Sequence, residues 1–191
     1  MNKIILASGS PRRKQLLEWA ELDFEVIISD APEDYPANLP ITEVPVYIAR
    51  NKAAAVYQQL NADRQHSSLI IAADTVVVLE NRIIGKSVDS MDAVSILGNL
   101  SGRWHQVITG VVIRKGDQEA SFHDLTEVEF NELSSEEINY YVSRYQPFDK
   151  AGAYAIQEWI GVTGIRRING DFYNVMGLPV SRVLKTLKGF R

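Results

Sequence analysis

The chain has 191 residues, of which 46% are hydrophobic and 23% charged, and it contains no cysteine. This length supports one substantial core, and the lack of cysteine excludes disulfide frameworks, thiolate metal sites and cysteine nucleophiles. The chain has a formal net charge of −4, so it lacks the excess of basic residues that is typical of a general nucleic-acid binder. No apolar run reaches the length of a membrane span or signal peptide, so we expect a cytoplasmic protein without membrane or nucleic-acid polymer partners.

The first third of the chain predicts strands that alternate with helices. Ile4–Leu6 reads as a strand, and Ser10 with Pro11 predicts the N-cap and first position of the helix that follows. A second strand is expected at Phe24–Ile28, followed by a proline-rich acidic loop. Thr42 is expected to cap a helix that runs to about residue 60.

The middle of the chain predicts the centre of a sheet. Residues 69–79 are almost continuously apolar and rich in β-branched side chains, which indicates a strand buried on both faces. A turn near Asn81 leads into a short strand, and a helix is expected at 89–100. Further strands are expected at 107–114 and 121–130.

The last third predicts two more helices on either side of a glycine-rich region. Ser134 and Glu137 have the spacing of a capping box, and Pro147 is expected to stop the helix that they open. Pro179 is expected to start the final helix. Because strands and helices are mixed and no linker separates them, we expect one α/β or α+β domain over residues 1–191.

Asp74 is the sharpest chemical signal. A carboxylate inside a long apolar run costs several kcal/mol unless a partner, a metal or an opening compensates it. Lys52 borders the buried face of the preceding helix, so an acid and a lysine are expected to converge there. A purely structural buried ion pair is the alternative.

The segment Ser8–Arg13 joins small residues, a helix N-terminus and two guanidinium groups, which is a combination suited to phosphate oxygens. A capped helix with solvated arginines explains it equally well. The sequence Gly85-Lys86-Ser87 lacks the first glycine of a P-loop, because Glu80 occupies that position. Lys86 is therefore either a charge directed at a site or an exposed turn lysine.

The remaining polar candidates are weaker. Asp149, Lys150 and Gln157 lie in a small-residue segment where backbone can approach a ligand, or where a surface loop carries a charged pair. The three histidines have no metal-ligand spacing, and we expect structural roles for them.

Five segments in order along nearly the whole chain resemble the Maf family of nucleoside triphosphate pyrophosphatases. They are Ser8–Arg13, Ala72–Val77, Leu100–Gly102, Asp149–Tyr154 and Val175–Pro179. The resemblance implies a two-lobed α/β fold, like that of inosine triphosphate pyrophosphatases, with a long mixed sheet and a central cleft. It also implies hydrolysis of a nucleoside triphosphate to the monophosphate and pyrophosphate, a divalent metal, and in many members a homodimer.

The resemblance also assigns roles to residues. The expected catalytic residues are Asp74, Lys52, Lys86 and Glu33, and Asp74 and Glu33 are the expected ligands of Mg²⁺, with Mn²⁺ as an alternative. The expected substrate-binding residues are Ser8, Ser10, Arg12, Arg13, Thr75, Asp149, Lys150 and Gln157. Arg12, Thr75 and Gln157 match the positions tied to specificity in the subgroup that acts on dTTP and UTP, so we expect these substrates or modified pyrimidine triphosphates.

Two residues depart from the family pattern. Ser87 stands where proline usually follows the lysine, and Glu158 stands where glycine usually follows the glutamine. Glu158 adds negative charge near the expected base pocket and restricts the backbone. Two alternatives to the dTTP and UTP reading therefore stay open. One is hydrolysis of other nucleotides, such as ITP, XTP or 7-methyl-GTP, and the other is a septum-inhibiting regulator of cell division.

Overall fold

The structure is a computed structural model that describes residues 3–190, and the chain divides into two compact units. The first unit contains the residues up to Asp74, Thr109–Asp124 and the residues from Gly177 onward. The second unit contains Thr75–Ile108 and Leu125–Met176. No helix within residues 3–190 combines the length and the apolar character that crossing a membrane requires.

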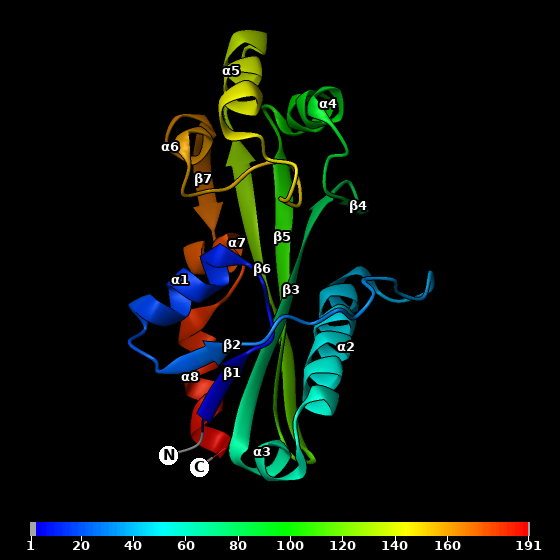
Figure 1. Cartoon of the computed structure of the whole chain (residues 1–191). Helices are drawn as coiled ribbons and strands as arrows, with labels where there is room; N and C mark the ends of the chain where they lie inside the picture. The colour runs from blue at the N-terminus through cyan, green and yellow to red at the C-terminus, as the bar shows by residue number, and fades with distance from the viewer. Residues whose placement is uncertain (1–2, 191) are drawn as a thin grey trace. The chain divides into compact units, whose positions relative to one another are not determined.

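Seven strands form one mixed sheet (Figure 1). They are β1 (Lys3–Leu6), β2 (Phe24–Val26), β3 (Ser68–Leu79), β4 (Arg82–Ile84), β5 (Trp104–Lys115), β6 (Gln118–Phe130) and β7 (Ile165–Asn169). Their order is β2-β1-β3-β5-β6-β7, with β4 paired to β3. β1 runs parallel to β2 and β3, whereas β4 runs antiparallel to β3 and β7 antiparallel to β6. The expected α/β class with a mixed sheet is confirmed.

Eight α-helices and two 3₁₀ helices are assigned within residues 3–190. They are α1 (Pro11–Trp19), η1 (Ile41–Glu43), α2 (Val44–Gln59), α3 (Ala62–Ser67), α4 (Ser90–Leu100), α5 (Ser135–Tyr145), α6 (Trp159–Gly164), α7 (Phe172–Met176), α8 (Val180–Leu187) and η2 (Lys188–Phe190). The short helices α3, α6 and α7 were not expected from the sequence, because five or six residues carry too little periodicity.

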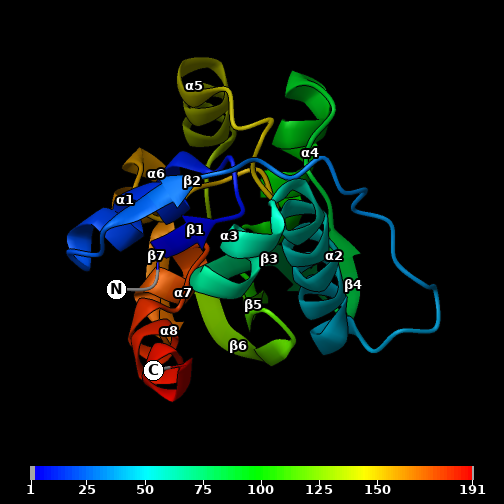
Figure 2. The same cartoon turned by 60° about the horizontal axis from the view of Figure 1, so that its bottom comes forward.

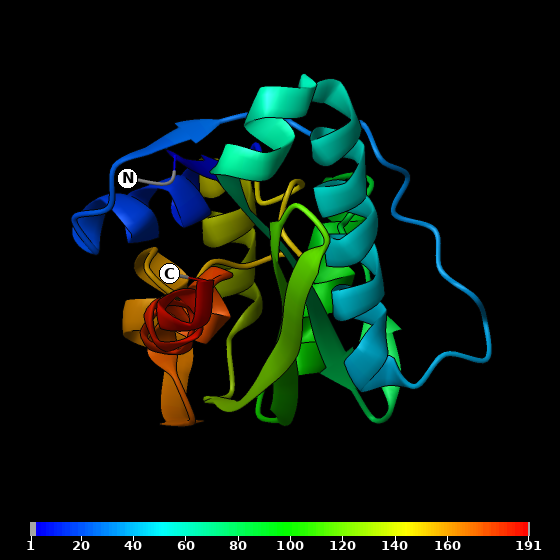
Figure 3. The same cartoon turned by 90° about the horizontal axis from the view of Figure 1, so that it is seen from below.

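The core of the first unit forms where α2 packs on β1, β3 and β5. Its buried side chains are Ile5, Ala7, Val46, Ala49, Ala53, Val56, Leu60, Ile70, Ala72 and Val112. Figures 2 and 3 show α2 on one side of these strands and α8 on the other. Because both faces are covered, the first half of β3 is buried throughout, as its continuous apolar sequence predicts.

Of the five predicted helix starts four are correct and one is wrong; Pro179, the expected start of the final helix, is the N-cap of α8. Ser10 precedes α1 with Pro11 in its first turn, Asp89 caps α4, and Ser134 forms the full capping box of α5. Thr42 is not a cap, because it lies inside η1, and α2 begins only at Val44. Proline in the first turn of α2 is tolerated, since the N–H groups there have no intrahelical partner.

The second unit contains a tight hairpin and a buried aromatic cluster. Glu80 and Asn81 both have positive φ angles, 48° and 63°, which is the backbone of a two-residue turn between β3 and β4. α4 contacts α5. His105, Phe130 and Tyr154 have ring centroids 5.1 to 5.4 Å apart and are buried.

Candidate active site

Asp74 lies in β3 with 9% of its surface exposed, between the buried Ala73 and the half-buried Thr75. Its Oδ1 atom is 2.7 Å from the Nζ atom of Lys52, which projects from α2. The expected convergence of an acid and a lysine is therefore present. This ion pair compensates the buried charge, as both the structural and the functional interpretation of Asp74 require.

Glu33 completes a three-member cluster with Lys52 and Asp74. The Glu33 Oε1 atom lies 2.7 Å from the same Lys52 Nζ atom. Glu33 comes from the loop that follows β2, and 47% of its side chain is exposed, against 12% for Asp74 and 11% for Lys52. One ammonium thus joins a loop carboxylate to a strand carboxylate.

The loop before α1 holds Arg13 in a fixed position. The Arg13 side chain is buried, its Nε–H donates to the Gly177 carbonyl at 2.8 Å, and its Nη1 donates to the Ser8 hydroxyl at 3.1 Å. The Ser10 N–H also donates to the Ser8 hydroxyl, at 3.2 Å, while the Ser10 side chain makes no capping bond. Ser8 therefore supports the loop that was expected to bind phosphate.

Electrostatics link this loop to the carboxylates. Burial lowers the pKa of Arg13 and neighbouring Arg12 lowers it further, whereas Asp74 and Glu33 act in the opposite direction. The five side chains of this region are Arg12, Arg13, Lys52, Asp74 and Glu33. Three cations against two carboxylates leave one formal positive charge, which favours an anionic ligand.

Thr75 and Lys86 belong to the second unit. Thr75 follows Asp74 directly in β3 and is half-buried. Lys86 is exposed, and its backbone forms an isolated antiparallel bridge with Ala151. The Gly152 N–H donates to the Gly85 carbonyl at 3.2 Å. The structure therefore brings the Lys86 segment beside the small-residue segment that contains Lys150.

Lys150 is buried in the second unit and faces two carboxylates. Its Nζ atom is 2.9 Å from Asp149 Oδ1 and 3.6 Å from Glu158 Oε1. Gln157 is exposed. The departure from the family pattern at Glu158 thus places a second carboxylate on a lysine that was expected to bind substrate.

Two buried groups escaped the sequence reasoning about sites. Tyr141 lies in α5, and its hydroxyl contacts both Ala155 and Glu158. His105 shares a 2.7 Å hydrogen bond with the Tyr154 hydroxyl, and burial lowers the His105 pKa to about 4. A buried tyrosine needs a hydrogen-bond partner, so the inward position of Tyr141 was the available signal.

Asp74 and Glu33 have the chemistry of a magnesium site. Hard cations such as Mg²⁺ are typically held by one or two carboxylates together with phosphate oxygens and water. Within residues 3–190, no cluster of three or more His, Cys, Asp or Glu side chains could hold a metal. The two carboxylates on Lys52 fit a metal that takes its remaining ligands from phosphate oxygens and water.

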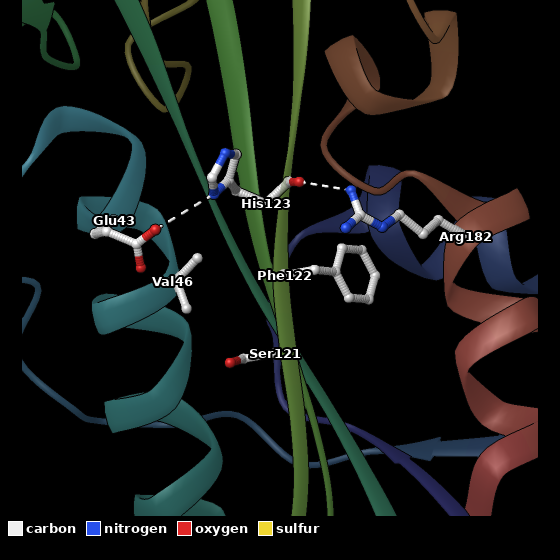
Figure 4. Close-up of a pocket in the computed structure, with 6 residues that line it drawn as sticks. All are labelled: Glu43, Val46, Ser121, Phe122, His123 and Arg182. Carbon is white, nitrogen blue, oxygen red and sulfur yellow. Dashed lines mark hydrogen bonds and ion pairs between the residues drawn. The ribbon is translucent and has the colours of Figure 1, made fainter.

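The first unit also has a cavity of about 350 Å³ at the start of α2 (Figure 4). Its lining residues are Glu43, Val46, Ser121, Phe122, His123 and Arg182. The ionic groups contact one another: His123 lies 3.5 Å from Glu43, and Arg182 donates to the His123 carbonyl at 2.7 Å. None of the six lining residues is an expected site residue, and we assign no ligand to this cavity.

Comparisons with known proteins agree with one another. The sequence model of the Maf family, described as Maf-like protein, matches residues 3–190. The chain is 52% identical over 185 residues to the dTTP/UTP pyrophosphatase of Cytophaga hutchinsonii, covering 97% of this chain and 83% of that protein. It is 49% identical over 189 residues to the dTTP/UTP pyrophosphatase of Parabacteroides distasonis, covering 98% and 96%.

A solved structure supports the fold. The structure of the Staphylococcus aureus Ham1 protein aligns with a TM-score of 0.54 at 17% identity, covering 99% of this chain and 100% of that one. At this identity the likeness concerns the fold alone.

Proposed function

Because the chain belongs to the Maf family, we propose that it is a nucleoside triphosphate pyrophosphatase that hydrolyses dTTP and UTP to the monophosphate and pyrophosphate. The near 50% identity to relatives with the name dTTP/UTP pyrophosphatase carries this proposal. The cluster of Lys52, Asp74 and Glu33 beside Arg13 supports it, since this cluster joins carboxylates to a local positive charge.

The reaction needs a water molecule in line with the bond that breaks. Water attacks the α phosphorus, the bond from that phosphorus to the α,β-bridging oxygen breaks, and pyrophosphate leaves with the bonding electrons. We assign to Asp74 the orientation of this water and the acceptance of its proton. The Lys52 ammonium, 2.7 Å away, holds the Asp74 carboxylate in place.

The cationic side chains bind and neutralise the triphosphate in this proposal. Arg13 is already oriented by Gly177 and Ser8, so little conformational entropy is lost when a phosphate replaces water around it. Arg12, Lys86 and Lys150 supply further positive charge, with Ser10 and Asp149 in the same segments. Arg12, Thr75 and Gln157 are proposed to select the base, as the resemblance implies.

Asp74 and Glu33 are the proposed ligands of a divalent cation, Mg²⁺ or alternatively Mn²⁺, since carboxylate oxygens suit both ions. Such a cation would supply charge neutralisation for the phosphates. The Lys52 ammonium bridges the two carboxylates at 2.7 Å from each, so both lie where they would hold such a cation.

We also propose a homodimeric protein in the cytoplasm, on the strength of the family resemblance. Its partner in this proposal is a small nucleotide, and the local cluster of cations supports that choice better than a polymer, since the whole chain has a net charge of −4. Sedimentation equilibrium of the purified chain tests the dimer.

A panel of nucleotides tests the substrate. Pyrophosphate release is measured from UTP, dTTP, CTP, ITP, XTP and 7-methyl-GTP, with and without Mg²⁺. We expect UTP and dTTP to have the highest kcat/KM and to require the metal. A preference for ITP, XTP or 7-methyl-GTP would contradict the base assignment of Thr75 and Gln157.

Substitution of Asp74 tests the mechanism. Asp74→Asn keeps the size of the side chain and removes its charge, so we expect turnover to fall at least about a hundredfold. Asp117→Asn, in the exposed turn between β5 and β6, is the matched control. Near-normal turnover of Asp74→Asn with a normal circular dichroism spectrum would refute this role, and loss of division arrest in the same variant would exclude a purely regulatory function.

A further inference from the structure

The turn that carries Gln157 is held by its own backbone. The Glu158 N–H donates to the Ala155 carbonyl at 3.1 Å, and the Glu158 carbonyl accepts from Gly161 at 2.9 Å. A Cβ atom on Gly161 would lie 1.7 Å from the Ile156 carbonyl oxygen, so the first turn of α6 packs directly on the turn. Gln157 is exposed while Ala155 and Ile156 on the same turn are buried.

A single buried hydroxyl joins the two ends of this turn. The Tyr141 hydroxyl accepts a hydrogen bond from the Ala155 N–H at 3.1 Å and donates one to the Glu158 carboxylate at Oε2. Tyr141 is fully buried, and its ring stacks on Tyr145 with a centroid distance of 4.9 Å. The hydroxyl is therefore fixed by the packing of α5 and cannot follow a movement of the turn.

Glu158 is held from its other oxygen as well. Its Oε1 atom lies 3.6 Å from the Nζ atom of buried Lys150, which pairs with Asp149 at 2.9 Å. Only 22% of the Glu158 side chain is exposed. A carboxylate with one oxygen bonded to a tyrosine hydroxyl and the other facing an ammonium has little conformational freedom. Glu158 therefore fixes the turn relative to α5.

We propose that Tyr141 and Glu158 are positioning residues that set base selectivity by fixing the backbone of Gln157. This inference rests on the proposed function, because it takes Gln157 as the residue that reads the base. It adds a specific role for the glutamate at the position where the family pattern has glycine.

The chemistry of the base explains why a fixed backbone matters. A glutamine amide offers one acceptor oxygen and two donor hydrogens, and it can rotate to present either group. Uracil and thymine present an acceptor at position 4, whereas cytosine presents a donor there. Because the amide can rotate on any turn, a held turn acts by fixing where the amide lies against position 4 of the base, and discrimination against CTP depends on that placement.

Kinetics of Tyr141→Phe test the proposal, with kcat and KM measured separately for UTP and CTP. The substitution keeps the ring and removes both hydrogen bonds. We expect the ratio of kcat/KM for UTP to that for CTP to fall about tenfold, in proportion to the loss of one charge-assisted hydrogen bond. We expect the KM for UTP to rise, while kcat stays within about twofold of the wild type.

A double mutant separates positioning from general damage. If Tyr141 acts through Gln157, Tyr141→Phe should not change the ratio further in a Gln157→Ala background. Tyr140→Phe, on the exposed side of α5, is the matched control and should leave the ratio unchanged. Glu158→Leu removes the acceptor by a second route and should lower the ratio in the same direction if Tyr141→Phe does not fold.

The outcomes distinguish this inference from the proposed function. Wild-type protein with no UTP or dTTP hydrolysis would overturn the proposed function before any variant is made. Wild-type selectivity that survives in folded Tyr141→Phe or Glu158→Leu would overturn the positioning role and leave the proposed function intact. Additive effects of Tyr141→Phe and Gln157→Ala would also overturn it.

Discussion

Lys52 makes two ion pairs of equal length with carboxylates that differ in burial. Asp74 and Lys52 are both largely buried, whereas nearly half of the Glu33 side chain is exposed. Lys52→Met leaves Asp74 without its nearest cation, so we expect the free energy of unfolding to fall by about 2 to 3 kcal/mol. Glu33→Gln should cost less than about 1 kcal/mol, because an exposed ion pair contributes little.

Urea unfolding of the two variants measures this difference. Lys52→Met breaks the buried pair with Asp74 as well as the exposed pair with Glu33, so equal losses in the two variants would contradict the role of burial. Both variants are expected to lose turnover, since both residues belong to the proposed site. Glu33→Gln should therefore lose turnover with little loss of stability, whereas Lys52→Met should lose both.

The same residues show how far the sequence could predict the site. The charge of Asp74 inside an apolar strand required a partner, and the position of Lys52 beside the buried face of the preceding helix indicated which residue it is. Glu33 carried no such signal, because water hydrates an exposed loop carboxylate and no protein partner is required. Only the family resemblance indicated Glu33. The contact of Glu158 with Tyr141 and Lys150 was not predictable, since it depends on the packing of α5 against a turn.

Close packing of α2 on β5 depends on a glycine. A Cβ atom on Gly110 would lie 2.2 Å from the Val46 backbone nitrogen and 2.3 Å from the Pro45 carbonyl carbon. Because backbone atoms at the start of α2 cannot move aside, we expect Gly110→Ala to lower the free energy of unfolding by at least about 3 kcal/mol. Thermal unfolding of the purified variant measures it.

Gly98→Ala is the contrasting control. Gly98 lies in α4, and a Cβ atom there meets nothing within 4 Å. Alanine is favoured over glycine in a helix, so this variant should gain up to about 1 kcal/mol. If both alanine variants unfolded at the same temperature, the steric argument for Gly110 would be wrong.

At the level of elements, the long periodic segments were predictable and the short or tertiary features were not. The strand over residues 69–79, the helix of residues 89–100 and the capping box at Ser134 carry their own patterns. The start of α2 does not, because Thr42 has the residue type of a cap but the chain makes a 3₁₀ turn there. Strands β5 and β6 also extend beyond their predicted ends, where polar residues continue the pairing.

At the level of the whole molecule, the two units are assembled from segments that are far apart in the sequence. The chain passes from one unit to the other inside β3, between Asp74 and Thr75, and again inside β5, inside β6 and before Gly177. The sequence therefore predicts one domain without a linker, and nothing in its composition marks where one unit ends. Chain continuity within a strand places the expected catalytic acid and an expected specificity residue next to each other.

The pH dependence of folding provides a prediction for the molecule as a whole. Burial lowers the pKa of His105 to about 4, whereas a histidine in the unfolded chain titrates near 6.5. Between these values the unfolded chain binds a proton that the folded protein does not. The free energy of unfolding should therefore fall as pH decreases from about 6.5 to about 4, by up to about 3 kcal/mol from this residue, and His105 should have no effect above that window.

Urea unfolding of the wild type and of His105→Gln at several pH values between 4 and 7 tests this pH dependence. Glutamine can still form a hydrogen bond with the Tyr154 hydroxyl but does not titrate, so the loss of stability with decreasing pH should be smaller than in the wild type. His66→Gln, at an exposed position of α3, controls for the substitution itself. Because the rest of the chain is the same in the wild type and in His105→Gln, the difference between their slopes isolates His105. Parallel slopes for His105→Gln and the wild type would mean that the buried imidazole does not contribute to acid unfolding.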